Sequence, residues 1–393
     1  MANLNRAVAD VLRIKFKLGL FDNPYIDTKL TVKVFHSEQH QALALQAAKE
    51  SICLLKNDQQ ILPLKHNLHS VAVIGPLAKS TYLGGYANTE DKGISILDGI
   101  KQRAGDTFKV EYGSGYEPDS AARLQTDYLK KAIELVNKSD VAIVVLGEDM
   151  KEVGEGKDRA NLDLNKLQEN LIETIYKTGK PVVVVLSNGR PLCINWVAKN
   201  IPAVVEAWFG GEKGGLAVAD VLLGNYNPSG KLPITFPRST GQIPYYYNHK
   251  PSSRHIYVDE DSTALYAFGH GLSYTTFAYS GLHISPLSIP ANGISNITVR
   301  VENTGNVEGT EVAQLYVRDV VSSVTTPVLS LKGFNRIDLK PGESRTVTFK
   351  LNAAELAVWN RQMKHVVEPG EFKIMVGSAS DDIRQNGSLY IVK

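Results

Sequence analysis

The hydrophobic period of the chain changes once, and this change most restricts the folds open to it. Before about residue 228, short apolar runs alternate with segments of helical pattern. Strands that are apolar along their whole length are typical of a parallel sheet covered by helices on both faces. We therefore expect an α/β domain with a mostly parallel sheet. Its strands are predicted at 71–75, 109–112, 141–146, 181–186 and 204–209.

After about residue 277 the period becomes two. Apolar and polar residues alternate in several short segments, and Gly, Pro and Asn cluster between them. This spacing predicts an antiparallel β-sandwich of immunoglobulin or fibronectin type III-like type. The alternating segments are 297–301, 314–318, 346–351, 372–376 and 389–392.

Two helices are predicted before the first strand. Residues 3–19 place apolar side chains on one stripe, and residues 36–56 do the same with Ala48, Ile52 and Leu55 among them. The first of these helices has no strand before it. It therefore resembles the end of a domain that the rest of the sequence does not show.

Composition excludes several classes of protein. The 43 basic and 41 acidic residues leave a net charge of +2, so no nucleic-acid partner is expected. The sequence contains no run of about eighteen apolar residues, so no membrane span is predicted. The first residues lack the apolar core of a signal peptide. Cys53 and Cys193 lie in apolar segments and are expected to be buried free thiols. No Cys/His cluster has metal-ligand spacing, so neither a metal nor a cofactor is expected.

One loop concentrates carboxylates at a place where chemistry is expected. Residues 147–159 directly follow an apolar run and hold three glutamates, two aspartates and an arginine among three glycines. Ligands of α/β sheets bind outside the carboxyl ends of the strands, and a glutamate there is a candidate general acid. The alternative is a solvated acidic turn closed by an ion pair between Glu155 and Arg159.

Several long segments carry a resemblance to a known family. Residues 15–25, 189–191, 224–233 and 268–277 are very similar to segments of the family-three glycoside hydrolases. The similarity is to bacterial β-glucosidases with a C-terminal fibronectin type III-like domain. It extends from about residue 5 to residue 392.

The resemblance implies a retaining exo-β-glycosidase, in which one carboxyl group attacks the sugar and a second protonates the leaving oxygen. In the family the nucleophile is an aspartate of an N-terminal barrel, and the acid/base glutamate comes from the α/β domain. No Ser-Asp-Trp nucleophile segment occurs here, so we expect no nucleophile in this chain. The implied segments are a remnant of the last barrel helix and linker (1–25), the α/β sandwich (26–227), a connector packed on it (228–276) and the fibronectin-like domain (277–393).

The resemblance also assigns roles within the carboxylate loop. Residues 155–159 match the acid/base loop of one branch of the family, with Glu155 in the place of the acid/base. Glu212 is the alternative, because other branches place the acid in the loop that contains it. Arg159 could hold Glu155 by a charge-assisted hydrogen bond. Substrate-binding roles are predicted for a further set: Glu148, Asp158, Arg159 and Asn88.

The predicted function is therefore the acid/base part of a β-glucosidase-like enzyme that removes terminal β-linked glucose. The expected partners are a β-linked oligosaccharide or glycoside and a barrel-domain chain that carries the nucleophile. Two alternatives stay open: a non-catalytic carbohydrate-associated or partner module, since fold alone does not set function, and part of a β-xylosidase-type enzyme.

Overall fold

The computed structural model describes residues 1–65, 67–87, 93–118, 121–252 and 256–393. The chain forms two compact units, Met1–Ala44 and Leu45–Lys393. The first unit holds α1 (Ala2–Lys17), α2 (Thr28–Val34) and the start of α3 (Glu38–Ser51). Helix α1 confirms the helix predicted at 3–19, and none of its residues is buried.

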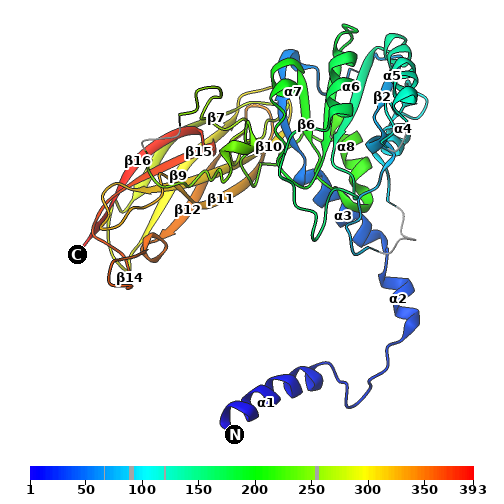
Figure 1. The fold of residues 1–393 in the computed structure, drawn as a ribbon. Coiled ribbons are helices and arrows are strands. Elements are labelled where there is room, and N and C mark those ends of the chain that lie inside the picture. The colour runs from blue at the N-terminus through cyan, green and yellow to red at the C-terminus, as the bar shows by residue number, and fades with distance from the viewer. Residues whose placement is uncertain (66, 88–92, 119–120, 253–255) are drawn as a thin grey trace. The chain divides into compact units, whose positions relative to one another are not determined.

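A six-stranded sheet forms the first half of the second unit (Figure 1). Its strand order is β1-β6-β5-β4-β2-β3. All neighbouring pairs from β6 to β3 are parallel, and only the edge strand β1 is antiparallel. The predicted, mostly parallel sheet is confirmed. The strands are β1 (Cys53–Asn57), β2 (Ser70–Ile74), β3 (Lys109–Gly113), β4 (Val141–Gly147), β5 (Val182–Ser187) and β6 (Ala203–Glu206).

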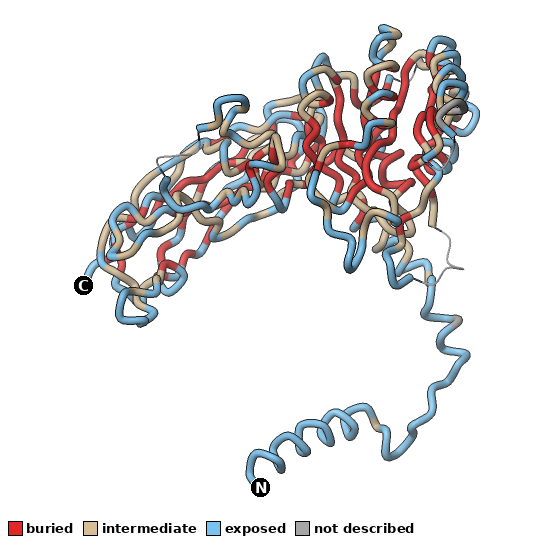
Figure 2. The backbone as a smooth tube through the Cα atoms, viewed as in Figure 1, coloured by how far each residue is buried: buried red, intermediate tan, exposed pale blue. Residues whose placement is uncertain are grey.

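Helices cover both faces of this sheet, which explains its uninterrupted apolar strands. Alternate side chains of one strand enter two separate cores, as Val145 and Leu146 of β4 do. Helices α3, α4 and α8 contribute to the first core, and α5, α6 and α7 to the second. Figure 2 shows the buried strands between the exposed outer surfaces of the helices. The helices are α4 (Ile96–Ala104), α5 (Ala122–Asn137), α6 (Lys166–Tyr176), α7 (Asn195–Asn200) and α8 (Gly214–Leu222).

The helix predicted at 36–56 is wrong in its last turn. Helix α3 ends at Ser51, and strand β1 begins at Cys53. Leu54 lies in one core while Cys53 and Leu55 lie in the other, which only an extended chain achieves for adjacent residues. The apolar pattern is compatible with a helix, but the free edge of β6 pairs with these residues instead.

The period-two region forms a β-sandwich, as predicted. One sheet has the order β11-β10-β15-β16-β8 and the other β12-β9-β7. Inward side chains from both sheets, such as Val299 and Ile374, make one core. The strands are β7 (Phe277–Ser285), β8 (Ser288–Pro290), β9 (Ile294–Asn303), β10 (Gly309–Asp319), β11 (Ser330–Leu339), β12 (Ser344–Asn352), β13 (Val358–Trp359), β14 (His365–Val366), β15 (Gly370–Ala379) and β16 (Asp382–Val392).

The segment between the two domains contacts the α/β core directly. The Leu272 amide donates to the Leu54 carbonyl at 2.8 Å, and the Tyr274 hydroxyl donates to the Val221 carbonyl at 2.7 Å. The boundaries predicted for the four segments stay predictions. Cys53 and Cys193 are free and buried, as expected. Among the described residues, no helix combines the length and apolar character that crossing a membrane requires.

Candidate active site

The sheet has its topological switch point between β2 and β4. The chain leaves β2 to form β3 on one side, then returns to place β4 on the other side. The loops that follow β2 and β4 therefore diverge, and ligands of open α/β sheets bind in the crevice between such loops. The predicted carboxylate loop, 147–159, is the one that leaves β4.

The root of this loop is held by buried backbone contacts. The Gln168 side chain exchanges two hydrogen bonds with Gly147, each 2.8 Å long. The Glu148 amide donates to the Ser187 carbonyl at 2.9 Å. Gly147 has a φ of +135°, and a Cβ atom there would lie 2.0 Å from the Ser187 oxygen. Only glycine fits this position, so the exit direction of the loop is determined.

Glu148 is the buried centre of an ionic cluster with two partly exposed arginines. Its side chain is 0% exposed, and it accepts from Arg159 Nη1 at 3.1 Å, from Arg190 Nη1, and from the Gly189 amide at 3.2 Å. A buried carboxylate needs such paired charges to offset its lost hydration. Burial and these partners favour a structural role for Glu148; its predicted substrate contact stays untested.

Arg159 does not pair with Glu155. The alternative prediction, that an ion pair between these two residues closes the loop, is therefore wrong. Its guanidinium contacts Glu148 and donates to the Asp163 carbonyl at 2.8 Å. The buried carboxylate attracts the arginine more strongly than an exposed one, because water screens the exposed charge. Arg159 therefore forms no ion pair with Glu155.

Arg190 was not predicted as a site residue, yet it makes several of the cross-loop contacts. Besides Glu148, it donates to the Glu152 carbonyl at 3.3 Å and to the Lys157 carbonyl at 2.5 Å. It thereby ties the loop after β5 to the far side of the carboxylate loop. The available sequence signal was an arginine three residues after one buried strand and a glutamate directly after another.

Glu155 lies at the exposed tip of the loop and contacts the loop after β2. The Tyr86 hydroxyl donates to Glu155 Oε2 at 2.9 Å. Tyr86 is itself 92% exposed and belongs to the segment after β2, on the other side of the switch point. The two loops thus meet at an accessible carboxyl group. Asn88, predicted to bind substrate, lies outside the described residues.

The alternative acid, Glu212, lies after β6. It belongs to the short 3-10 helix η3 (Gly211–Lys213), its side chain is 25% exposed, and the neighbouring Lys213 Nζ lies 3.4 Å from its carboxylate. Its carbonyl accepts from the Ile94 amide at 2.8 Å. Strands β4 and β6 are separated by β5, so the two candidate acids occupy different loops of the same edge. Asp158 is exposed on the first of these loops.

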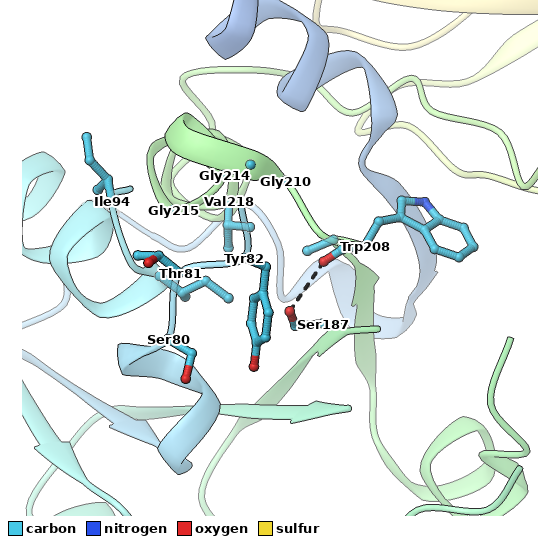
Figure 3. A pocket seen from close by; sticks show the side chains of 13 residues that line it. Ser80, Thr81, Tyr82, Ile94, Ser187, Trp208, Gly210, Gly214, Gly215 and Val218 are labelled. Atoms are coloured by element: carbon cyan, nitrogen blue, oxygen red, sulfur yellow. Dashed lines mark hydrogen bonds between the residues drawn. The ribbon is translucent and has the colours of Figure 1, made fainter. Parts of the chain in front are cut away.

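A small cavity lies between the loops after β2 and β6 (Figure 3). Tyr82 stacks on Phe209 beside it, with ring centroids 4.7 Å apart. The Ser187 hydroxyl donates to the Trp208 carbonyl at 3.3 Å, while the Trp208 indole points away from the cavity. The volume is about 20 Å³, which is room for one water but not for a sugar ring. A sugar would have to bind on the exposed side of these loops.

Together the fold and the site define a class: a helix-covered parallel sheet with a carboxylate loop at its switch point, followed by a β-sandwich. Residues 52–274 match the glycosyl hydrolase family 3 C-terminal domain, and residues 311–380 match the fibronectin type III-like domain. The chain belongs to glycosyl hydrolase family 3. The resemblance inferred from the sequence segments is thereby confirmed.

Known proteins are similar along nearly the whole chain. A β-xylosidase of Formosa agariphila is 46% identical over 98% of this chain, and a periplasmic β-glucosidase of Salmonella typhimurium is 38% identical over 98%. A β-glucosidase structure from Erythrobacter marinus matches 96% of the chain with a TM-score of 0.90 and 37% identity. A β-glucosidase from Listeria innocua, solved with laminaribiose, matches 97% with a TM-score of 0.88 and 33% identity. The chain spans 55% of each of those two relatives and 54% of each of those two structures.

Proposed function

We propose that this chain supplies the general acid/base half of a retaining exo-β-glycosidase site, with Glu155 as the acid/base. The observation that carries the proposal is the contact of Glu155 with Tyr86 across the switch point. An acid/base must reach both the leaving oxygen and a water molecule, so it needs an exposed side chain on a fixed backbone. Glu155 meets both needs, because it is exposed on a loop whose root is held by buried hydrogen bonds and whose centre is held by Arg190.

The mechanism assigns Glu155 two successive proton transfers. The carboxylic acid first protonates the glycosidic oxygen while a carboxylate nucleophile, about 5 Å away, attacks the anomeric carbon. The resulting Glu155 carboxylate then removes a proton from the water that hydrolyses the glycosyl intermediate. The nucleophile is supplied from outside the 393 residues, by a barrel-type domain or partner chain.

The proposed substrate is a terminal β-linked glucose of an oligosaccharide or glycoside. Three of the four similar proteins described above are β-glucosidases. A β-xyloside is the second candidate, because the Formosa agariphila relative at 46% identity is a β-xylosidase. The two sugars differ only in the exocyclic hydroxymethyl group. Parallel assays with the matched nitrophenyl β-glucoside and β-xyloside decide between them.

The first assay uses the purified chain alone at high concentration with a chromogenic β-glucoside. We expect no turnover, because the nucleophile is proposed to come from elsewhere. The same chain combined with a nucleophile-bearing barrel domain is expected to hydrolyse the substrate. Turnover by the chain alone would place a nucleophile within these residues and overturn this division of labour. Sugar binding without turnover in the combined system would favour the non-catalytic alternative.

The second assay tests Glu155 in the combined enzyme. Glu155→Ala is expected to lower hydrolysis of a glycoside with a poor leaving group by about 10²-fold or more, since that step needs protonation. An activated nitrophenyl leaving group needs little protonation, and added azide should restore its turnover, because azide attacks without a general base. Glu212→Ala is the matched control and should show neither pattern. The reverse result, with azide rescue only in Glu212→Ala, assigns the role to Glu212.

A further inference from the structure

Glu206 is a buried carboxyl group to which the proposed mechanism gives no role. It ends β6, is 0% exposed, and accepts two hydrogen bonds from neutral donors. Its Oε1 accepts from the Trp208 amide at 2.8 Å, and its Oε2 accepts from Asn188 Nδ2 at 3.1 Å. A buried carboxyl group without a cation among its bonding partners is costly as an ion and favours its protonated form.

The surroundings of Glu206 favour a proton on it. The pKa of Glu206 is raised to about 8: burial and the charge of Glu148 raise it, and they outweigh the hydrogen bonds from Trp208 and Asn188, which lower it. Its neighbour on β1 is the Cys53 thiol, whose own pKa burial raises to about 12. Asn188 Oδ1 is buried and has no hydrogen-bond partner among the described residues.

Asn188 connects this carboxyl group to the carboxylate loop. Its side-chain amide donates to Glu206 and also to the Arg190 carbonyl, at 2.7 Å. The Arg190 guanidinium in turn contacts Glu148 and the carbonyls of Glu152 and Lys157. The contacts therefore run without a break from Glu206 to both sides of the loop that carries Glu155.

The same carboxyl group also holds the turn after β6. Trp208 has a φ of +54°, a left-handed conformation that is strained for a residue with a Cβ atom. The hydrogen bond from its amide to Glu206 stabilises that turn. The turn places the Phe209 ring against Tyr82, at 4.7 Å, in the loop after β2. The loops after β2, β4, β5 and β6 thus share one buried support.

We infer that Glu206 is a positioning residue: a neutral buried acid that, through Asn188 and Arg190, holds the loop carrying Glu155 and the turn at Trp208 in one arrangement. The inference rests on the proposed function only where it concerns catalysis by Glu155. The part of it that Glu206 holds the loop and the turn does not depend on that function. Ionisation of Glu206 places an unpaired charge close to Glu148 and is expected to loosen the loop.

The test measures hydrogen exchange of the peptide that covers 148–159 in the full chain, from about pH 5 to about pH 9, corrected for intrinsic rates. In the wild type, loop protection should fall by about tenfold as pH rises through the Glu206 transition. Glu206→Gln is permanently neutral and of the same size, and its side-chain oxygen keeps one of the two acceptor positions of Glu206. Its loop should stay protected across the range. Glu173→Gln on α6 is the matched control and should keep the wild-type profile.

Two further readouts make the test independent of activity. The infrared difference spectrum of the wild type should show a carboxylic-acid band that is absent in Glu206→Gln. Trp208 fluorescence, isolated in a Trp196→Phe and Trp359→Phe background, should titrate with the loop in the wild type but not in Glu206→Gln. The inference is overturned if protection of the loop from hydrogen exchange does not change with pH in the wild type and is the same in Glu206→Gln and Asn188→Ala. Failure of the Glu155 assignment would appear only in the leaving-group and azide assays.

Discussion

Arg159 Nη1 lies 3.1 Å from the buried Glu148 carboxylate and leaves Glu155, four residues before it, to the Tyr86 hydroxyl. This choice of partner separates two tasks within one loop. The buried ion pair anchors the loop, and the exposed carboxyl group stays accessible to a substrate.

Arg190→Ala should destabilise the α/β domain by about 3 kcal/mol, because it leaves the buried Glu148 carboxylate with one cation in place of two. Urea unfolding of the α/β domain, followed by tryptophan fluorescence, measures this loss of stability. Both proteins carry Trp359→Phe, so that the fluorescence comes from Trp196 and Trp208 of the α/β domain. Arg384→Ala is the control, since its partner Asp382 is 39% exposed and the loss should stay below about 1 kcal/mol. Equal losses in both variants would contradict the anchoring role of Glu148.

Gly147→Ala should cost about 3 kcal/mol or more and release the root of the carboxylate loop. The added Cβ atom would lie 2.0 Å from the Ser187 oxygen, on a backbone with a φ of +135°. Gly179→Ala is the matched control: its φ is +74° but no atom lies within 4 Å, so the cost should be about 1 kcal/mol. Thermal unfolding compares the two. A smaller loss of stability at Gly147 than at Gly179 would show that the backbone at the loop root shifts at little cost to make room for the Cβ atom.

Tyr86→Phe should slow hydrolysis of glycosides with poor leaving groups by about tenfold in the combined enzyme, because it removes one hydrogen bond to Glu155. Stability should not change, since Tyr86 is 92% exposed. Rates on a series of aryl glycosides and a melting curve test both statements. Tyr390→Phe, a 43% exposed tyrosine of the fibronectin-like domain, should leave the rates as they are.

Two buried acids, Glu206 and Asp220, should affect the pH dependence of stability in opposite directions. The pKa of Glu206 is raised from 4.5 to about 8, so the stability of the wild type relative to Glu206→Gln should fall as pH rises between these values and then level off. Burial acts to raise the pKa of Asp220, but Lys49 and Arg103 outweigh it and lower that pKa. The stability of the wild type relative to Asp220→Asn should therefore fall as pH drops below about 3.8. Urea titrations across the pH range measure both differences, and a rise in the first difference with pH would contradict the buried neutral state of Glu206.

Much of the fold was predictable because the hydrophobic pattern is local. Uninterrupted apolar runs such as 141–146 indicate a strand buried on both faces, and β4 and its parallel neighbours confirm it. Strand β1 was missed, since Cys53–Asn57 is equally compatible with the end of a helix. What decides it is the edge of β6, which lies about 150 residues further along the chain and is invisible to a local pattern.

The candidate site was predictable only in part. The carboxylate loop and its position after a buried strand follow from the sequence, as does the choice of Glu155 and Glu212 as candidates. Their roles stay predictions. The contacts of Arg190 with Glu148, of Tyr86 with Glu155 and of Glu206 with Asn188 were not predicted, because the partners are 42, 69 and 18 residues apart in the chain. Such contacts exist only once parallel strands bring their carboxyl ends to one edge.

By itself, the sequence determined the order of the two domains, the parallel character of the sheet and the loop where carboxyl groups gather, since each depends on neighbouring residues. The tertiary structure alone decided which carboxyl group is buried and which is exposed. Glu148 and Glu155 have the same chemistry and lie seven residues apart. They differ because Arg159 and Arg190 converge on Glu148, while Glu155 extends beyond the protein interior, where water stabilises its charge.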